Sequence, residues 1–222
     1  MNVRRKRSAR GSGEDLRVEI LAAARALLLE TGHVDAVSIR AIGDAVGVSA
    51  PSIYRHFADK DVLIEAVCEE VFQDLESALM AAVVDDESPL ERLVSYGKAY
   101  VRFACEHPEH YRIGMMKISD EATALDHTLT NGAVVRLLVH INDCIAAGYF
   151  PPSDPLPLAL EAWALAHGLA SLQISKPYLP WGDRDALVDR ALRASLAGYC
   201  VLGAPPGHPI PPDVVAWNQA FR

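Results

Sequence analysis

Two pairs of side chains in the sequence have residue types that can bind a metal ion. His107 and His110 lie three residues apart among carboxylates, but Pro108 stands between them. His140 and Cys144 lie four apart, a spacing that places both on one face of a helix. Neither pair supplies the three or four ligands with recognisable spacing that a zinc site needs. We therefore expect no metal and no cofactor.

A third pair, His167 and Ser171, has the residue types of a general base and a nucleophile. The two residues are also four apart, so a helix would bring them together. The sequence shows neither a third residue placed to orient the histidine nor the sharp turn that surrounds a nucleophilic serine. We therefore expect a protein that binds its partners and is not an enzyme.

Charge is distributed unevenly along the chain. The net charge is −8, from 21 Lys and Arg against 29 Asp and Glu. Residues 1–60 hold ten basic and seven acidic side chains, a net of +3, which leaves −11 for residues 61–222. Basic side chains gain affinity for DNA by releasing phosphate counterions, whereas acidic ones are repelled. The two parts are therefore expected to have different partners.

A flexible basic arm, residues 1–13, begins the chain. It leads into Gly-Ser-Gly and not into an apolar stretch, so it lacks the organisation of a secretory signal. It either contacts DNA or serves as a solubilising tail. No uncharged apolar run of 18 residues follows, so we expect a cytoplasmic protein that does not enter a membrane. The basic residues of the arm are Arg4, Arg5, Lys6, Arg7 and Arg10.

The four cysteines, Cys68, Cys105, Cys144 and Cys200, occur singly. No Cys-x-x-Cys spacing suggests zinc binding or redox chemistry. We expect them to act as small buried hydrophobic residues.

Apolar spacing and turn residues predict three short helices in residues 14–57. Ser38 is expected to cap the second helix, and Gly47 to end it. Ser49 is expected to cap the third, with Pro51 tolerated in its first turn. Two short helices joined at a glycine turn are typical of a helix-turn-helix.

The remaining pattern is also helical, with no sustained strand alternation, so the sequence predicts an all-α fold of about nine helices. A long helix runs from Lys60 to about Val84, and its positive N-terminal end favours phosphate. The spacing of Ser88 and Glu91 is that of a capping box. Later helices are expected at 109–116, 121–147, 154–176 and 183–202. The proline-rich tail, 204–222, is expected to be extended, with Val214, Val215, Trp217 and Phe221 packing its end onto the fold.

The segment from Ser38 to Ser49, SIRAIGDAVGVS, and its continuation from Ser52 to Leu63, SIYRHFADKDVL, closely resemble the signature of the TetR family of bacterial repressors. Residues 50–52, Ala-Pro-Ser, depart from the pattern, since many members have glycine after the cap serine. The groove-facing surface is therefore expected to read an unusual operator.

The resemblance implies that residues 49–56 form a recognition helix in the major groove of duplex operator DNA. Arg55 is the strongest candidate for a base contact, because arginine can donate two bonds to guanine. The ring of Tyr54 either reaches phosphate or joins the small core, to which Phe57 is assigned. Expected base contacts are Ser49, Ala50, Pro51, Ser52 and Arg55, and expected phosphate contacts are Ser38, Arg40, Tyr54, His56 and Lys60.

The resemblance also implies a DNA-binding domain at 14–60, a ligand-binding and dimerisation domain at 61–203, and the tail at 204–222. Residues 163–168, WALAHG, resemble the Trp-x-x-x-His-Gly motif of one subgroup. Trp163 and His167 share a helical face that could line a pocket for a hydrophobic or amphipathic effector, or simply belong to the core. The expected pocket residues are Tyr100, Phe103, Tyr111, Met115, Leu137, Trp163 and His167.

DNA geometry favours a homodimer, because one recognition helix reads only a few base pairs. By resemblance, the helices near 154–176 and 183–202 pack against their mates in a second copy. The expected interface residues are Leu158, Ala162, Leu169, Leu172, Leu187, Ala191, Ala194 and Leu196, with burial inside one protomer as their alternative.

Together these features predict a DNA-binding transcriptional regulator, a repressor that a small ligand releases from its operator. Activation in place of repression stays open. The alternatives are a helical enzyme or carrier with an idle helix-turn-helix, and a DNA-binding protein that needs no ligand.

Overall fold

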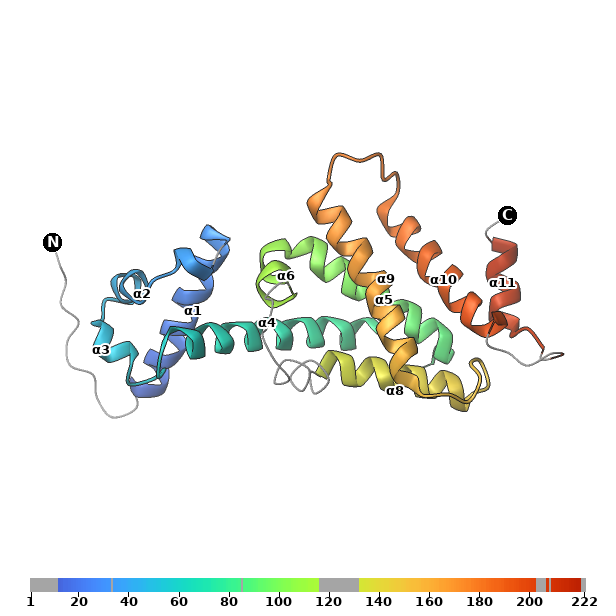
Figure 1. Cartoon of the computed structure of the whole chain (residues 1–222), viewed down its shortest axis with the longest axis horizontal. Helices are drawn as coiled ribbons and strands as arrows, with labels where there is room; N and C mark the ends of the chain where they lie inside the picture. Colours follow the sequence, from blue (N-terminus) through green and yellow to red (C-terminus); the bar gives the residue numbers. More distant parts are fainter. Residues whose placement is uncertain are drawn as a thin grey trace. The chain divides into compact units, whose positions relative to one another are not determined.

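The computed structural model describes residues 12–32, 34–84, 86–115, 132–202, 207 and 209–220, and every regular element in these ranges is helical (Figure 1). No helix among them is long and apolar enough to cross a membrane. The basic arm up to Gly11 and residues 116–131 lie outside the described part. The elements are α1 (Ser12–Thr31), the 3-10 turn η1 (Val34–Ala36), α2 (Ile39–Val46), α3 (Ala50–Ile53), α4 (Lys60–Ala82), α5 (Pro89–Glu106), α6 (Pro108–Met115), α8 (Gly132–Ala146), α9 (Pro155–Ser175), α10 (Arg184–Leu202) and α11 (Pro212–Ala220).

The chain divides into two compact units. The first comprises residues 1–72 and 109–118, and the second comprises residues 73–108 and 119–222. The long helix α4 therefore begins in one unit and ends in the other, and α6 belongs to the first unit although it follows α5 directly. The expected domain boundary at residue 60 falls at the first residue of α4.

The first unit has a core built from one face of each of its helices. In α1, Ile20, Leu21, Ala24 and Leu28 are buried, while Leu16 and Leu27 are half-buried. Phe57 is 2% exposed, as predicted, and Ala45 of α2 is exposed. The core residues are Ile20, Leu21, Ala24, Leu28, Val37, Ile42, Ile53, Phe57, Leu63, Ile64 and Val67.

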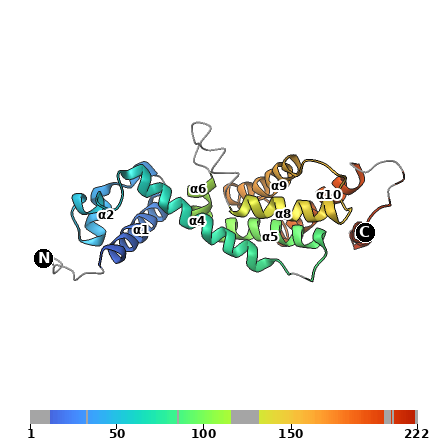
Figure 2. The same cartoon turned by 90° about the horizontal axis from the view of Figure 1, so that it is seen from below.

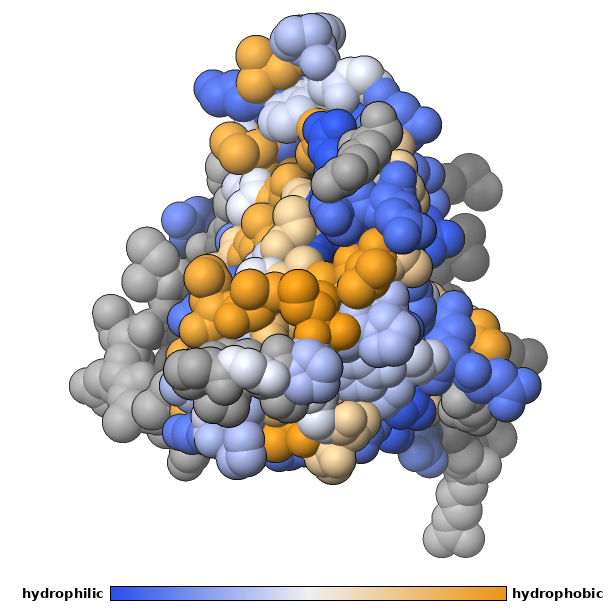
Figure 3. Space-filling view, turned by 90° about the vertical axis from the view of Figure 1, so that its right-hand side faces the viewer, coloured by the Kyte–Doolittle hydropathy of each residue, from blue (hydrophilic) through white to orange (hydrophobic). Residues whose placement is uncertain are grey.

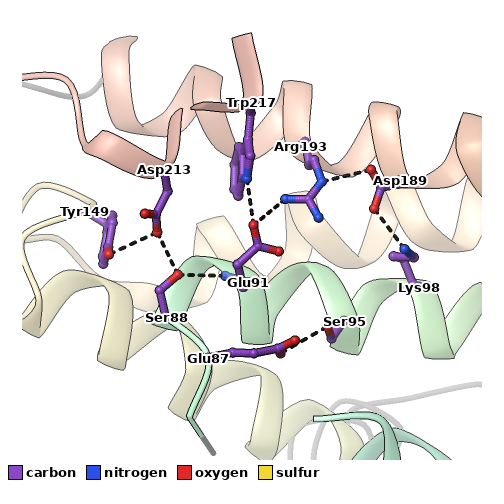
Figure 4. A network of polar contacts seen from close by, with 10 residues as sticks. All are labelled: Glu87, Ser88, Glu91, Ser95, Lys98, Tyr149, Asp189, Arg193, Asp213 and Trp217. Carbon is purple, nitrogen blue, oxygen red and sulfur yellow. Dashed lines mark hydrogen bonds and ion pairs between the residues drawn. The ribbon is translucent and has the colours of Figure 1, made fainter. Parts of the chain in front are cut away.

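In the second unit α5 lies at the centre and packs against α8, α9 and α10 (Figure 2). The predicted cap is present, because Ser88 Oγ accepts a hydrogen bond from the Glu91 backbone N–H at 3.3 Å. The Glu91 side chain does not complete the reciprocal half of a capping box. Its carboxylate instead accepts from Arg193 of α10 and Trp217 of α11 (Figure 4).

The prediction of an extended tail is wrong for residues 212–220, which form α11. Pro212 stands at the start of the helix, where its missing N–H costs nothing. Val214 and Trp217 are buried, as the apolar residues of the tail suggested, whereas Val215 is 44% exposed. Asp213 accepts hydrogen bonds from Ser88 at 2.7 Å and from Tyr149 at 3.1 Å, so polar contacts also hold α11 on the unit (Figure 4).

Candidate DNA-binding site and ligand cavity

Two glycines and one serine set the geometry of the helix pair α2–α3. The Ser38 hydroxyl oxygen accepts from the Ala41 backbone N–H at 3.1 Å and caps α2, as predicted. Gly47 ends the helix in the left-handed conformation, with φ 76°, and its N–H donates to the Gly43 carbonyl. A Cβ on Gly43 would lie 2.8 Å from the Val48 carbonyl oxygen, so the turn can close this tightly only at glycine.

The third helix is shorter than predicted. Regular α-helix covers Ala50–Ile53 only, and residues 54–56 continue as turns. Ser49 occupies the cap position but makes no capping hydrogen bond. Its hydroxyl lies 3.2 Å from that of Ser52. Pro51 stands in the first turn, as expected.

The outer surface of this segment carries the candidate base-reading side chains. Arg55 is exposed, and its guanidinium donates to the Ser52 hydroxyl at 3.1 Å. Tyr54 is 50% exposed, so its ring is not part of the small core and is available to a phosphate. Pro51 is exposed, while Ala50 is half-buried.

Of the expected phosphate contacts, Ser38 and Arg40 lie at the beginning of α2, Lys60 at the beginning of α4, and Tyr54 and His56 in the turn after α3. Arg40 is exposed, and its Nε lies 3.9 Å from Asp44 Oδ2. Lys60 is the first residue of α4, as predicted. Asp59 caps this helix by accepting from the Val62 N–H at 2.9 Å, which satisfies one of the N–H groups that would attract phosphate. The sequence reading missed this cap, although aspartate directly before a helix is its ordinary signal. His56 is half-buried.

A cavity that is partly open to solvent lies in the second unit, and its empty space of about 460 Å³ includes space continuous with the bulk solvent. Helices α5, α8, α9 and α10 all contribute to its wall. Of the expected pocket residues, Tyr100, Leu137 and Trp163 line it. The remaining lining residues are Leu93, Tyr96, Gly97, Ala162, Leu165, Ala166, Leu192, Ser195 and Leu196.

Three of the expected residues form a chain of hydrogen bonds beside this cavity. Trp163 Nε1–H donates to the Tyr100 hydroxyl oxygen at 3.1 Å, and that hydroxyl lies 3.2 Å from His167 Nδ1. Burial lowers the pKa of His167, because it disfavours the charged form of the imidazole. The Trp-x-x-x-His spacing thus brings both side chains to one tyrosine of α5.

The other expected pocket residues lie elsewhere. Phe103 is absent from the cavity wall, and its ring packs at 4.9 Å from that of His107. Tyr111 is buried but belongs to the first unit. The side chain of Met115 lies outside the described residues.

The side chains of His140 and Cys144, one of the candidate metal pairs, each pack among other groups of the protein. His140 packs against the ring of Tyr96, with centroids 5.1 Å apart. Cys144 is buried, and desolvation raises the pKa of its thiol to about 12. Cys144 and Cys200 are thus inert buried side chains, as predicted, while Cys68 and Cys105 are half-buried.

The expected interface residues divide into two groups. Leu172 is 51% exposed and Ala194 is exposed, whereas Leu158, Leu169, Leu187 and Ala191 are half-buried. Ala162 and Leu196 line the cavity; Leu196 is buried within the protomer, whereas Ala162 is half-buried. Further apolar surface lies where α10 ends and α11 begins, and Figure 3 shows hydrophobic residues gathered on the face seen from that side. The exposed apolar side chains there include Val201, Leu202 and Ile210.

Two family models match the chain. Residues 20–67 match the model described as "Bacterial regulatory proteins, tetR family", and residues 93–202 match "Tetracyclin repressor-like, C-terminal domain". The first match contains the helix pair α2–α3, and the second contains every lining residue of the cavity. The chain belongs to the TetR family of bacterial regulatory proteins, as the sequence signature predicted.

Individual relatives agree with this assignment. The chain is 29% identical over 112 residues to the HTH-type transcriptional regulator EthR of Mycolicibacterium smegmatis and 30% identical over 115 residues to the HTH-type transcriptional repressor KstR2 of Mycobacterium tuberculosis. These matches cover 50% and 52% of this chain but only 51% and 55% of the relatives, about half their length. A solved structure, a protein of unknown function from Rhodococcus sp. RHA1, superposes with a TM-score of 0.72 at 30% identity, covering 83% of this chain and 95% of that one.

Proposed function

We propose that the protein is a dimeric transcriptional repressor that binds operator DNA through α3 and leaves it when a small ligand occupies the cavity. The observation that carries the proposal is the pair α2–α3. Its turn is fixed by Gly43 and Gly47, and it presents Tyr54 and Arg55 to solvent on a rigid support. A rigid helix pair with an exposed arginine is suited to reading base edges in a major groove. The relative KstR2 is named a transcriptional repressor, which supports repression over activation for this protein.

A second copy is proposed to pack on the exposed apolar stripe of α9 and α10. On α9 the stripe follows residues four apart, which share one face. A Cβ on Gly168 or Gly198 would meet no atom within 4 Å, so the backbone of each helix is open to close approach there. We define the stripe as Leu160, Ala164, Gly168 and Leu172 of α9 with Leu187, Ala191, Ala194, Gly198 and Val201 of α10.

Release is proposed to follow from movement of helices that connect the cavity to the DNA-binding unit. α5 lines the cavity and continues, after His107, into α6. In the first unit, Arg112 of α6 lies beside Gly32 at the end of α1, where a Cβ would be 3.3 Å from its guanidinium. A ligand that binds better to the form with widely separated recognition helices, reached by a shift of α4 and α6, lowers operator affinity by population shift.

A gel-shift titration of the purified protein on duplex fragments from upstream of its own gene, with random duplex as competitor, tests the proposal. The expected result is selective, salt-sensitive binding of at least two protomers per site. Binding of random and upstream duplex with equal affinity at every fragment tried would contradict it. Turnover of a small molecule by the same preparation would then favour a helical enzyme or carrier with an idle helix-turn-helix.

A further inference from the structure

The described wall of the cavity in the second unit carries no charged side chain. None of its lining residues in the described part of the chain is Asp, Glu, Lys, Arg or His. The polar side chains of the wall are Tyr96, Tyr100, Trp163 and Ser195. A ligand in the cavity therefore meets hydrocarbon surface and these four side chains.

Two of the four are bound to other groups of the protein. The Tyr96 hydroxyl donates to the Ala133 carbonyl oxygen at 2.6 Å. Ser195 is a hydrogen-bond partner of Tyr199, one turn further along α10. Neither side chain is set up to hold an ionised ligand.

The other two polar side chains of the wall bind each other. Trp163 donates to the Tyr100 hydroxyl, which in turn lies within hydrogen-bond distance of His167 Nδ1. Burial lowers the pKa of His167 and so disfavours a positive charge on this chain of contacts, which leaves it poorly suited to pair with an anion.

The charged residues that adjoin the lining positions on α5 and α10 are paired with one another. Lys98 Nζ lies 2.9 Å from Asp189 Oδ1, and Arg193 lies 2.6 Å from Glu91 and 2.8 Å from Asp189 (Figure 4). On the opposite side, Arg92 of α5 lies 3.4 Å from Asp143 of α8. On α5 and α10, a charged head group would have to break one of these pairs to gain a partner. Arg136 of α8, next to the lining residue Leu137, is exposed to solvent.

We infer that the cavity takes an uncharged, apolar ligand, held by its shape and by removal of hydrocarbon surface from water, and that it rejects the ionised form of the same skeleton. The inference rests on the proposed function, in which the ligand of this cavity is the effector that releases the protein from DNA. An ionised group buried without a partner pays its full desolvation cost, whereas a neutral apolar group gains from burial.

Matched pairs of neutral and anionic probes test the inference on the full chain. N-phenyl-1-naphthylamine and 8-anilinonaphthalene-1-sulfonate share one ring system, and only the second carries a sulfonate. Fluorescence titration at pH 8 should show saturable binding of one neutral probe per protomer. Decan-1-ol should displace the probe at a concentration at least about tenfold below that needed for decanoate, because a penalty of about 1.4 kcal/mol already corresponds to tenfold.

A substitution that fills the cavity tests whether the probe binds there. Ala162→Phe places a ring in the wall and should abolish probe binding, while Ala81→Phe, at an exposed position of α4, should leave it unchanged. Circular dichroism melting of both variants verifies folding. If Ala162→Phe does not fold, the comparison of the two matched pairs on the native protein still decides the question.

Equal or tighter binding of the anionic members, or no saturable binding of any probe, would overturn the inference. Such a result, together with selective operator binding in the gel shift, would leave the repressor function standing. Neutral-selective binding without selective operator binding would instead leave the cavity chemistry standing and overturn the repressor function.

Discussion

Trp217 and Glu91, 126 residues apart in the chain, meet at 2.7 Å, where the indole N–H donates to the carboxylate. The same carboxylate oxygen accepts from Arg193, and the Arg193 guanidinium lies over the Trp217 ring, 4.8 Å from its centroid. One carboxylate thus joins α5, α10 and α11 (Figure 4).

Trp217→Ala should lower the free energy of unfolding of the second unit. The change removes a large buried ring together with its cation–π contact, and truncation of such a side chain costs about 3–5 kcal/mol. Trp217→Phe keeps a ring but loses the N–H, so it should cost about 1 kcal/mol for the hydrogen bond alone. Urea denaturation measures both, and equal stability of the alanine variant and the native protein would contradict the role given to α11.

The stability contributed by Asp189 should depend on pH below neutrality. Burial alone would raise the pKa of this carboxyl, but hydrogen bonds from Arg193 and Lys98 outweigh burial and lower it. Because the folded pKa lies below the unfolded value of about 3.9, the contribution is complete above that pH and is lost as the pH falls through the folded pKa.

Urea denaturation of the native protein and Asp189→Asn between pH 7 and pH 3 checks this. The stability difference should stay constant down to about pH 4 and shrink below it. Glu65→Gln, at an exposed position of α4, serves as the control. If the stability difference between the native protein and Asp189→Asn grew toward acid pH, the pKa of Asp189 would be raised in the folded state and not lowered.

Gly43→Ala should weaken both folding of the first unit and DNA binding. Alanine is the better helix former, but its Cβ would lie 2.8 Å from the Val48 carbonyl oxygen, a backbone atom with little freedom to move. We expect a net cost of about 1–3 kcal/mol, typical of overpacking. Thermal unfolding measures it, with Ala45→Ser at an exposed position of the same helix as the matched change. A stabilised Gly43→Ala protein would disprove the close turn.

Arg55→Ala should weaken operator binding by about 1–3 kcal/mol and relax base preference at one position, if the guanidinium reads a base. Lys60→Ala should weaken binding to all sequences alike, since phosphate contacts carry no sequence information. Fluorescence anisotropy on operator and random duplex separates the two effects. Equal losses on both duplexes for Arg55→Ala would reassign Arg55 to phosphate.

Ala194→Glu and Leu172→Glu should convert the dimer to monomers, because each places a carboxylate in the apolar stripe of α9 and α10. Sedimentation velocity reports the change, and Gln219→Glu on the exposed side of α11 should sediment as the native protein does. A variant that remains dimeric would locate the interface elsewhere.

Local signals in the sequence predicted the local structure well. The caps at Ser38 and Ser88 and the helix end at Gly47 follow from residue type and spacing alone, because each concerns atoms a few residues apart. Helical spacing without strand alternation predicted the all-α fold for the same reason.

The sequence did not predict α11 or most of the cavity wall. Five prolines between Pro205 and Pro212 favoured an extended tail, although Pro212 opens a helix. Helical periodicity places Ala162 and Leu196 on the apolar faces of their helices, but does not show whether they face a cavity, their own core or a second copy. That distinction depends on how helices distant in the sequence pack together, which spacing does not encode.

The placement of α11 also orders the events of folding during synthesis. Ser88 and Glu91 lie at the start of α5. Their hydrogen bonds with Asp213 and Trp217 can form only after more than a hundred further residues have left the ribosome. Contacts of such separation close large loops and form late. The core of the DNA-binding unit formed by residues 20–67 can assemble while the rest of the chain is still being made. A nascent chain halted before residue 212 would therefore carry a folded helix-turn-helix on a bundle whose α5 still lacks its last partner.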